Sequence, residues 1–298
     1  MEPPDGAWTG PRRAPDRHAA ALNTLRSMNP SCIAFVGGGN MATALIAGLV
    51  KSGQPASEIL VVEPFEAQRG KLAADLGVTA LAQADERLAA AGVVVWAVKP
   101  QFFAAAAAPC RPFVAAALQL SVMAGLRSEA IVRASGSQRV VRAMPNTPAL
   151  IGRGISGLYA RPEVSHAERE QAQALLAATG ATLWLEHEQD LDAVTALSGS
   201  GPAYVFYFVE AMMQAAVEMG LSQAQGRTLA LATFDGATAL AAQSPLHPSQ
   251  LRAQVTSQGG TTFAAVSALD AQGVQAAFVQ ALHAARSRSR ELGDEFGG

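Results

Sequence analysis

A short apolar run that leads through three glycines into a helical pattern constrains this chain more than any other feature. The run is CIAFV, residues 32–36, and the segment that follows carries apolar residues at helical spacing up to Gly53. Gly37 to Ala42 fit the pattern G-x-G-x-x-A. In such a turn the first glycine permits the bend, Gly39 lets a pyrophosphate approach the backbone, and the helix N-terminus attracts its charge. The segment predicts a dinucleotide site; a glycine-rich turn that serves only packing is the alternative.

The alternation of strand and helix continues along the chain. Further apolar runs lie at 58–63, 92–98, 117–125, 139–146, 154–160 and 181–186, and the last helical pattern between them covers about 165–179. Such runs, buried on both faces and separated by helices, indicate a parallel sheet with helices on each side. We therefore expect an α/β fold with an N-terminal Rossmann-type, parallel-sheet dinucleotide-binding domain at residues 30–188. Residues 189–298 show only Ala-rich and Leu-rich helical segments, which predicts an all-helical dimerisation and substrate domain.

The composition is that of a globular protein. Of the 298 residues, 50% are hydrophobic and 15% charged, and the formal net charge of -2 gives no reason to expect a nucleic acid or an anionic membrane as partner. The most apolar stretch, which starts at Pro202, is interrupted by Glu210 and Glu218 and predicts a buried helix. Cys32 and Cys110 lack metal-ligand spacing, so we expect no metal and a reducing, cytoplasmic compartment.

The N-terminal residues 1–29 are expected to form a disordered extension. The first part is rich in Pro, Arg and Ala and has no apolar core of a signal peptide. It is either a disordered lead-in or sequence upstream of a start at Met28.

Candidate cofactor contacts gather where the predicted strands end, since ligands of such folds lie at the carboxyl edge of the sheet. They are Val36, Gly37, Gly38, Gly39, Asn40, Met41, Glu63, Ala97, Val98, Lys99, Pro100, Ala124 and Asn146. Each has an ordinary structural alternative, such as a solvated loop residue for Lys99 and an Asx-type turn for Asn146.

Glu63 bears on the choice between NADH and NADPH. An acid at the end of the second strand accepts hydrogen bonds from ribose hydroxyls and repels a 2′-phosphate, which favours NADH. The alternative is a solvated helix cap followed by Pro64, and Arg69 could reach a 2′-phosphate.

Five strings together resemble the pyrroline-5-carboxylate reductase family, whose members catalyse the last step of proline biosynthesis. They are GGGNMA, AVKP, RAMPNTPA, LSGSGPAYVF and VTSQGGTT followed by AVSALDAQG. The resemblance covers residues 30–292 and implies an NAD(P)H-dependent oxidoreductase that reduces 1-pyrroline-5-carboxylate to L-proline with NADPH or NADH. One departure is Gln258, where the family commonly has proline.

The segment VTSQGGTT, residues 255–262, places four hydroxyl side chains around two glycines at the start of a helix. The implied substrate is a small cyclic imine with a carboxylate. Ser257 and the N–H groups around Gly260, Thr261 and Thr262 would hold that carboxylate, because an open helix N-terminus binds anions. The resemblance implies that Thr262 lies closest to the imine nitrogen, as hydrogen-bond partner and proton donor. The alternative is that these hydroxyls are ordinary helix caps.

Two other functions compete with this reading. A β-hydroxyacid dehydrogenase-like reductase would use a lysine of the helical domain, and no lysine follows Lys99. A non-catalytic dinucleotide-binding sensor would show a degraded substrate segment, whereas SQGGTT is intact.

The helical segments are apolar on more than one face, as in VFYFVEAMMQAAVEM. We therefore expect an obligate homodimer, with the option of a higher assembly of dimers.

Glu188 resembles a family position near the substrate, with a solvated loop acid as the alternative.

Overall fold

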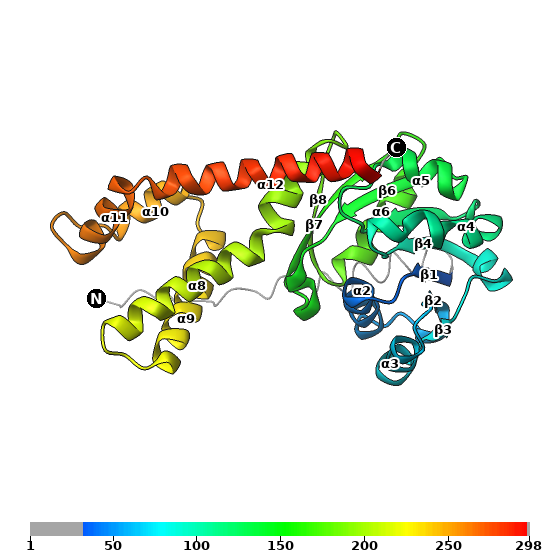
Figure 1. Cartoon of the computed structure of the whole chain (residues 1–298), viewed down its shortest axis with the longest axis horizontal. Helices are drawn as coiled ribbons and strands as arrows, with labels where there is room; N and C mark the ends of the chain where they lie inside the picture. The colour runs from blue at the N-terminus through cyan, green and yellow to red at the C-terminus, as the bar shows by residue number, and fades with distance from the viewer. Residues whose placement is uncertain (1–31, 297–298) are drawn as a thin grey trace, which may run out of the picture. The chain divides into compact units, whose positions relative to one another are not determined.

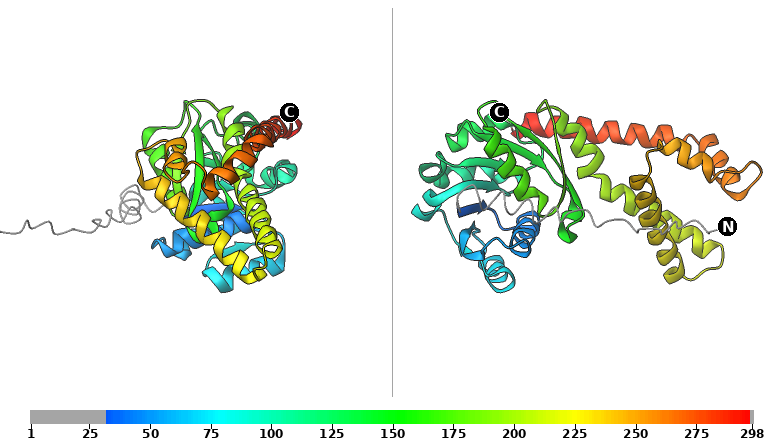
Figure 2. Two further views of the ribbon diagram at one scale, coloured as in Figure 1. Left: turned by 90° about the vertical axis from the view of Figure 1, so that its left-hand side faces the viewer. Right: turned by 180° about the vertical axis from the view of Figure 1, so that it is seen from behind.

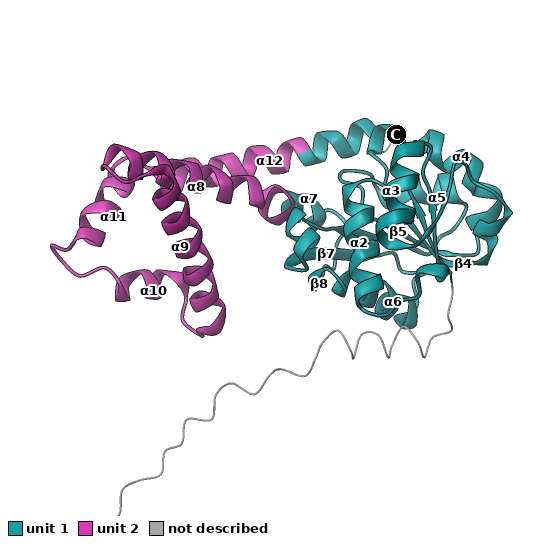
Figure 3. Ribbon diagram, turned by 90° about the horizontal axis from the view of Figure 1, so that it is seen from below, with its two compact units in different colours: residues 1–195, 289–298 teal, residues 196–288 magenta. Residues whose placement is uncertain are grey.

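The computed structural model describes residues 32–296, so the expected extension at residues 1–29 lies outside the described residues. The described chain divides into two compact units, shown in Figure 3. Unit 1 contains residues 32–195 and 289–296, and unit 2 contains residues 196–288.

Unit 1 is built on an eight-stranded sheet with the strand order β3-β2-β1-β4-β5-β6-β7-β8 (Figure 1). The strands are β1 (Cys32–Val36), β2 (Ile59–Val62), β3 (Thr79–Leu81), β4 (Ala91–Trp96), β5 (Leu118–Ser121), β6 (Val140–Met144), β7 (Gly154–Ala160) and β8 (Gly180–Trp184). Its helices are α2 (Asn40–Lys51), α3 (Glu66–Leu76), α4 (Phe103–Val114), α5 (Ser128–Ser135), α6 (His166–Ala177) and α7 (Asp190–Val194). The order reverses direction between β1 and β4, which creates the switch point where open α/β sheets bind ligands.

Alternate residues of the strands feed two hydrophobic clusters, one on each face of the sheet. Ile33 and Phe35 of β1 join the cluster that includes α2 and α6. Ala34 and Val36 join the other cluster, with residues of α4 and α5. Helices on both faces explain why the strands are continuous apolar runs, and the predicted α/β fold class is confirmed.

The sheet departs from the expected parallel arrangement at one pair. β6 and β7 are antiparallel, with Ala143 opposite Leu158. The connection between them contains only the short 3₁₀ helix η4 (Thr147–Ile151), which is too short for a crossover that would return a parallel strand. β7 and β8 are parallel again, joined through α6.

Unit 2 consists of helices, as expected for this part of the chain. They are α8 (Gly201–Glu218), α9 (Gln223–Gln243), α10 (Pro248–Gln254), α11 (Thr261–Ala271) and the first part of α12 (Val274–Phe296), whose end belongs to unit 1. Figures 1 and 2 both show α8 and α9 side by side. Gly226 allows their close approach, because a Cβ atom there would lie 2.8 Å from the Cβ of Ala216. Tyr204 and Phe278 make an edge-to-face contact between α8 and α12, with centroids 5.7 Å apart.

Few side chains of unit 2 are buried within one chain. Val209 and Ala216 are the buried residues of α8, although the helix is strongly apolar. Among the described residues, none of the helices combines the length and the apolar character needed to cross a bilayer.

Candidate functional site

The glycine-rich turn connects β1 to α2 as the sequence predicted. Gly37 has φ +98°, and a Cβ atom there would lie 2.8 Å from the carbonyl oxygen of Ala97. The position therefore requires glycine, both for its backbone conformation and because the segment after β4 lies against it. Gly39 is the N-cap of α2, no side chain caps the helix, and no acidic residue lies in its first turn.

The arrangement of these residues fits a dinucleotide. A Cβ atom on Gly39 would meet nothing within 4 Å, so the backbone is open on that side. The uncapped N–H groups of α2 point their partial positive charge toward the same space. Ala42, in contrast, is 0% exposed and packs in the core, as a close helix–strand contact requires. The turn thus has the open side that a pyrophosphate needs, which packing alone does not explain.

Glu63 lies beside the turn and not in solvent. Its side chain is buried, and its Oε2 accepts a hydrogen bond from the backbone N–H of Gly38 at 2.9 Å. Oε1 accepts the N–H of Phe65 at 3.0 Å. The alternative of a solvated helix cap is therefore wrong, since two backbone groups hold the carboxylate at the carboxyl end of β2. Arg69 donates through Nη1 to the carbonyl oxygens of Glu63 and Pro64, at 3.0 and 2.7 Å.

The other candidate cofactor residues of unit 1 follow β4, β5 and β6. Ala97 and Val98 are half-buried, and Lys99 is exposed at the start of the 3₁₀ helix η3 (Pro100–Phe102). Ala124 is half-buried in the segment after β5. The three segments meet the same edge of the sheet as Gly37, because β1, β4, β5 and β6 are parallel.

Asn146 is buried and connects β6 to β7. Its Oδ1 accepts the backbone N–H of Ile155 at 3.0 Å, and it makes no cap hydrogen bond to η4. The side chain is therefore fixed by the start of β7, and an Asx-type turn is not its role.

The predicted substrate segment begins α11 in unit 2. Gly259 has φ +75°, Gly260 is the N-cap, and no side chain caps the helix. The hydroxyl of Thr256 does not cap α11, because it donates to the carbonyl oxygen of Arg252, a residue of α10. The N–H of Gly260 donates to the carbonyl oxygen of Ser257, so the turn itself uses one of the expected donors. The first turn of α11 keeps its other N–H groups open.

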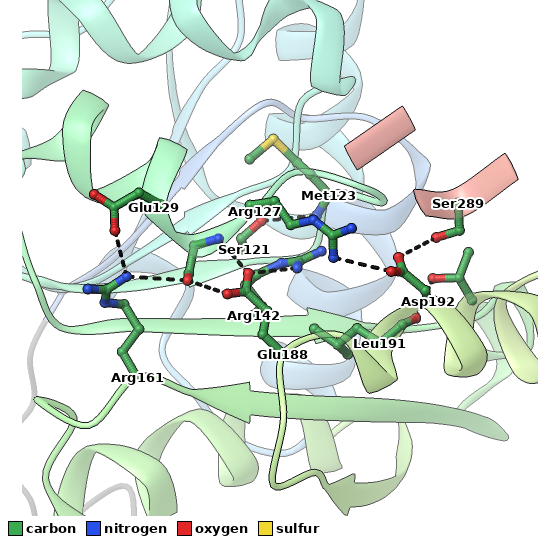
Figure 4. A network of polar contacts seen from close by, with 12 residues as sticks. Ser121, Met123, Arg127, Glu129, Arg142, Arg161, Glu188, Leu191, Asp192 and Ser289 are labelled. Carbon is green, nitrogen blue, oxygen red and sulfur yellow. Dashed lines mark hydrogen bonds and ion pairs between the residues drawn. The ribbon is translucent and has the colours of Figure 1, made fainter. Parts of the chain in front are cut away.

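A buried polar network in unit 1 was not predicted from the sequence (Figure 4). Arg142 of β6 is 3% exposed and donates from Nη1 to Oε1 of Glu188 at 2.8 Å. Glu188 also accepts the backbone N–H and the hydroxyl of Ser128, at 2.6 and 2.7 Å. Burial acts to raise the pKa of Glu188, but Arg142 and Ser128 outweigh it and hold that pKa below its usual value.

The network corrects the view of Glu188 as a solvated loop acid. An isolated arginine inside a strand is the only sequence signal that could have indicated it, since a buried guanidinium needs a carboxylate partner. The same part of the structure has an open pocket of about 370 Å³, lined by Arg127, Tyr159 and residues 186–189. Among the described residues, no group of three His, Cys, Asp or Glu side chains is placed to hold a metal ion.

Comparisons with known proteins agree with both units. A family model described as pyrroline-5-carboxylate reductase dimerisation matches residues 188–292. A second model, NADP oxidoreductase coenzyme F420-dependent, matches residues 32–125. A pyrroline-5-carboxylate reductase of Pseudomonas aeruginosa is 44% identical, over 91% of this chain and 100% of the relative. The enzyme of Haemophilus influenzae is 41% identical, over 89% of this chain and 98% of the relative.

Solved structures give the same result. A pyrroline-5-carboxylate reductase from Coxiella burnetii has a TM-score of 0.82 and 34% identity, and covers 89% of this chain and 99% of its own. Plasmodium falciparum pyrroline carboxylate reductase, solved with NADP bound, has a TM-score of 0.80 and 26% identity, with 88% and 98% covered. These findings confirm the resemblance of the five sequence strings. The chain belongs to the pyrroline-5-carboxylate reductase family.

Proposed function

We propose that this protein reduces 1-pyrroline-5-carboxylate to L-proline with NADPH or NADH, the last step of proline biosynthesis. Its relatives at 34–44% identity carry this enzyme name. The observation that carries the proposal is the start of α11, where Gly260 is the N-cap, two threonines follow it, and no side chain caps the helix. Such an end suits the carboxylate of a small cyclic imine.

The dinucleotide would be held by unit 1. Val36 to Met41 would surround the pyrophosphate, with the open backbone at Gly39 and the uncapped α2. Glu63 would accept the ribose hydroxyls, and its fixed carboxylate favours NADH over NADPH. When bound, the reduced nicotinamide supplies the hydride.

The nicotinamide half would lie over the segments Ala97–Pro100 and Ala124, beyond the switch point of the sheet. Asn146 would also contact the nicotinamide half of the cofactor. Its Oδ1 is already used by Ile155, so its amide nitrogen would be the group that donates to the cofactor.

The substrate would be held by unit 2. The hydroxyl of Ser257 and the N–H groups of Thr261 and Thr262 would bind its carboxylate, and the N–H of Gly260 would keep the turn closed on Ser257. The hydroxyl of Thr262 would donate its proton to the imine nitrogen and regain one from water, while the hydride from the cofactor adds to the neighbouring carbon. Because the imine is itself basic and the cofactor supplies the hydride, most of the catalysis would be positioning.

A homodimer completes the proposal. The family model names dimerisation for residues 188–292, which supports self-association through this part of the chain. Within one chain, unit 2 leaves large apolar side chains uncovered, including Tyr207 at 70% and Leu240 at 61% exposure. We take the dimer to be obligate, because so much apolar surface is not stable in water.

Nucleic acids and membranes are not expected partners, and the two free thiols suit the cytoplasm.

Nicotinamide absorbance followed with pyrroline-5-carboxylate and each of NADH and NADPH tests the function. Oxidation of either cofactor that depends on the imine, with proline as product, is the expected result. Cofactor binding without turnover would favour the sensor instead.

A further inference from the structure

The end of α12 touches the segment that follows β5. Both belong to unit 1. A Cβ atom on Gly125, where φ is +77°, would lie 3.2 Å from the Cβ of Leu292 and 3.4 Å from the backbone nitrogen of Gly293. A Cβ atom on Gly293 would lie 2.9 Å from the carbonyl oxygen of Gly125. The two backbones approach this closely because both positions are glycine.

A buried carboxylate reinforces the contact (Figure 4). Asp192 of α7 is 2% exposed; its Oδ1 accepts the hydroxyl of Ser289 at 2.8 Å, and its Oδ2 lies 3.2 Å from Nη1 of Arg127. The guanidinium of Arg127 also lies against the helix, since a Cβ atom on Gly293 would be 2.9 Å from its Nε and Nη2. A buried charge that depends on two partners tolerates little movement of either one. Asp192 therefore fixes α12 to the residue just after the β5 segment.

The segment between these fixed points is Val122–Leu126. Met123 and Leu126 are buried in the hydrophobic cluster against which Phe296, the last residue of α12, packs. The N–H of Met123 donates to the hydroxyl of Ser121. Ala124 lies between Met123 and Gly125 at the carboxyl edge of β5, on the nicotinamide side of the proposed cofactor site. α12 thus contacts Gly125, which is one neighbour of Ala124, and Phe296 packs against the cluster that contains the other neighbour, Met123.

We propose that the end of α12 is a positioning element for the segment Val122–Leu126 and thereby sets the affinity for the nicotinamide half of the dinucleotide. This inference rests on the proposed function, because it assumes that a nicotinamide dinucleotide binds. The residues that act are Gly293, Ser289 and Asp192, and none of them is placed in contact with the cofactor. Their effect is transmitted through Gly125 and Arg127.

Substitution Gly293→Ala in the full-length protein tests the inference. Alanine has a higher helix propensity than glycine, so the effect of this substitution on helix propensity alone would not destabilise α12. The new methyl group has to displace the carbonyl of Gly125 or the guanidinium of Arg127. Dissociation constants are measured for NADH and for ADP-ribose, which lacks the nicotinamide. If the wild-type protein binds NADPH more tightly, then NADPH and 2′-phospho-ADP-ribose are used.

We expect the NADH constant to rise at least about tenfold, a change of about 1.4 kcal/mol, while the ADP-ribose constant stays within about twofold. Gly70→Ala is the matched control, because Gly70 is an exposed residue of α3 and its Cβ would meet nothing within 4 Å. Equal effects on both ligands, or no effect on NADH, would overturn the inference. If Gly293→Ala does not fold, Ser289→Ala gives the same comparison with a smaller expected change. A wild-type protein that binds neither dinucleotide would instead refute the proposed function.

Discussion

The carboxylate of Glu63 accepts the backbone N–H of Gly38 at 2.9 Å, across the gap between β2 and the glycine-rich turn. The acid is therefore held in place before a cofactor binds, with its other oxygen on the N–H of Phe65. A 2′-phosphate beside this negative charge would be repelled, whereas two ribose hydroxyls would find an acceptor. The Plasmodium falciparum pyrroline carboxylate reductase was solved with NADP bound, so the preference of this protein has to be measured with both dinucleotides.

We predict that Glu63→Ser shifts the ratio of NADPH to NADH affinity by about tenfold toward NADPH, equal to about 1.4 kcal/mol. Loss of the charge removes the repulsion, and the guanidinium of Arg69, whose Nη1 lies 3.0 Å from the carbonyl oxygen of Glu63, leaves a positive charge beside the position. Isothermal titration with both dinucleotides measures the ratio. Glu66→Ser is the control, because it removes the same charge from an exposed position of α3. An unchanged ratio in Glu63→Ser would remove this residue from cofactor selection.

The ion pair between Glu188 and Arg142 should contribute to stability. We predict that Glu188→Gln lowers the free energy of unfolding by about 3 kcal/mol, because it removes the charged ion-pair partner of the buried guanidinium of Arg142. Urea denaturation at neutral pH measures the loss. Glu186→Gln, in the same connection, is the control. A loss no larger than that of the control would show that the pair contributes little.

The same pair predicts how stability depends on pH. The pKa of Glu188 is lowered in the folded protein, so its contribution is complete above the ordinary carboxyl value of about 4.5 and is lost as the pH falls through the lower folded value. The wild-type protein should therefore lose its advantage over Glu188→Gln below about pH 4.5. Parallel denaturation curves from pH 7 to pH 3 provide the test. A constant difference over that range would contradict the assignment.

The glycine-rich turn could be predicted from the sequence, whereas the direction of β7 could not. The pattern from Gly37 to Ala42 predicted the turn, since this glycine spacing directly after an apolar run and before a helical pattern is typical of dinucleotide-binding turns. The reversal of β7 was not predicted, because strand direction depends on how the short segment after Asn146 turns, and apolar periodicity carries no direction.

The polar network was missed for a similar reason. Arg142 and Glu188 stand far apart in the sequence, and each alone resembles a surface residue. Only the sheet brings β6 next to the connection after β8 and to α5. Likewise, nothing in the sequence around Gly293 indicates its close contact with Gly125, which only the fold brings about.

Thr262→Ala should lower turnover far more than cofactor affinity. Its hydroxyl is proposed to face the imine nitrogen, and losing one such partner costs about 1–3 kcal/mol, or about 5-fold to 150-fold in kcat. Thr256→Ala is the matched control, because that hydroxyl is already used by the carbonyl oxygen of Arg252. Steady-state kinetics together with the dinucleotide dissociation constant give the comparison. Unchanged turnover would exclude Thr262 from the mechanism.

The last prediction concerns the dimer. Tyr207 of α8 and Leu240 of α9 are 70% and 61% exposed in one chain, and residues of the same kind are spread over the helices of unit 2. A charge introduced at both positions, by Tyr207→Glu with Leu240→Glu, would have to be buried if these faces meet a second copy, at a cost of several kcal/mol per charge. We therefore expect light scattering to show that the variant dissociates, and we expect it to lose activity together with thermal stability. Gln243→Glu is the control, because it adds a charge at the exposed polar residue that ends α9, and it should retain activity and thermal stability. Because an obligate dimer unfolds and dissociates together, the melting temperature of the wild-type protein should also rise with protein concentration. A monomeric variant with full activity would show that the reductase does not need its second copy.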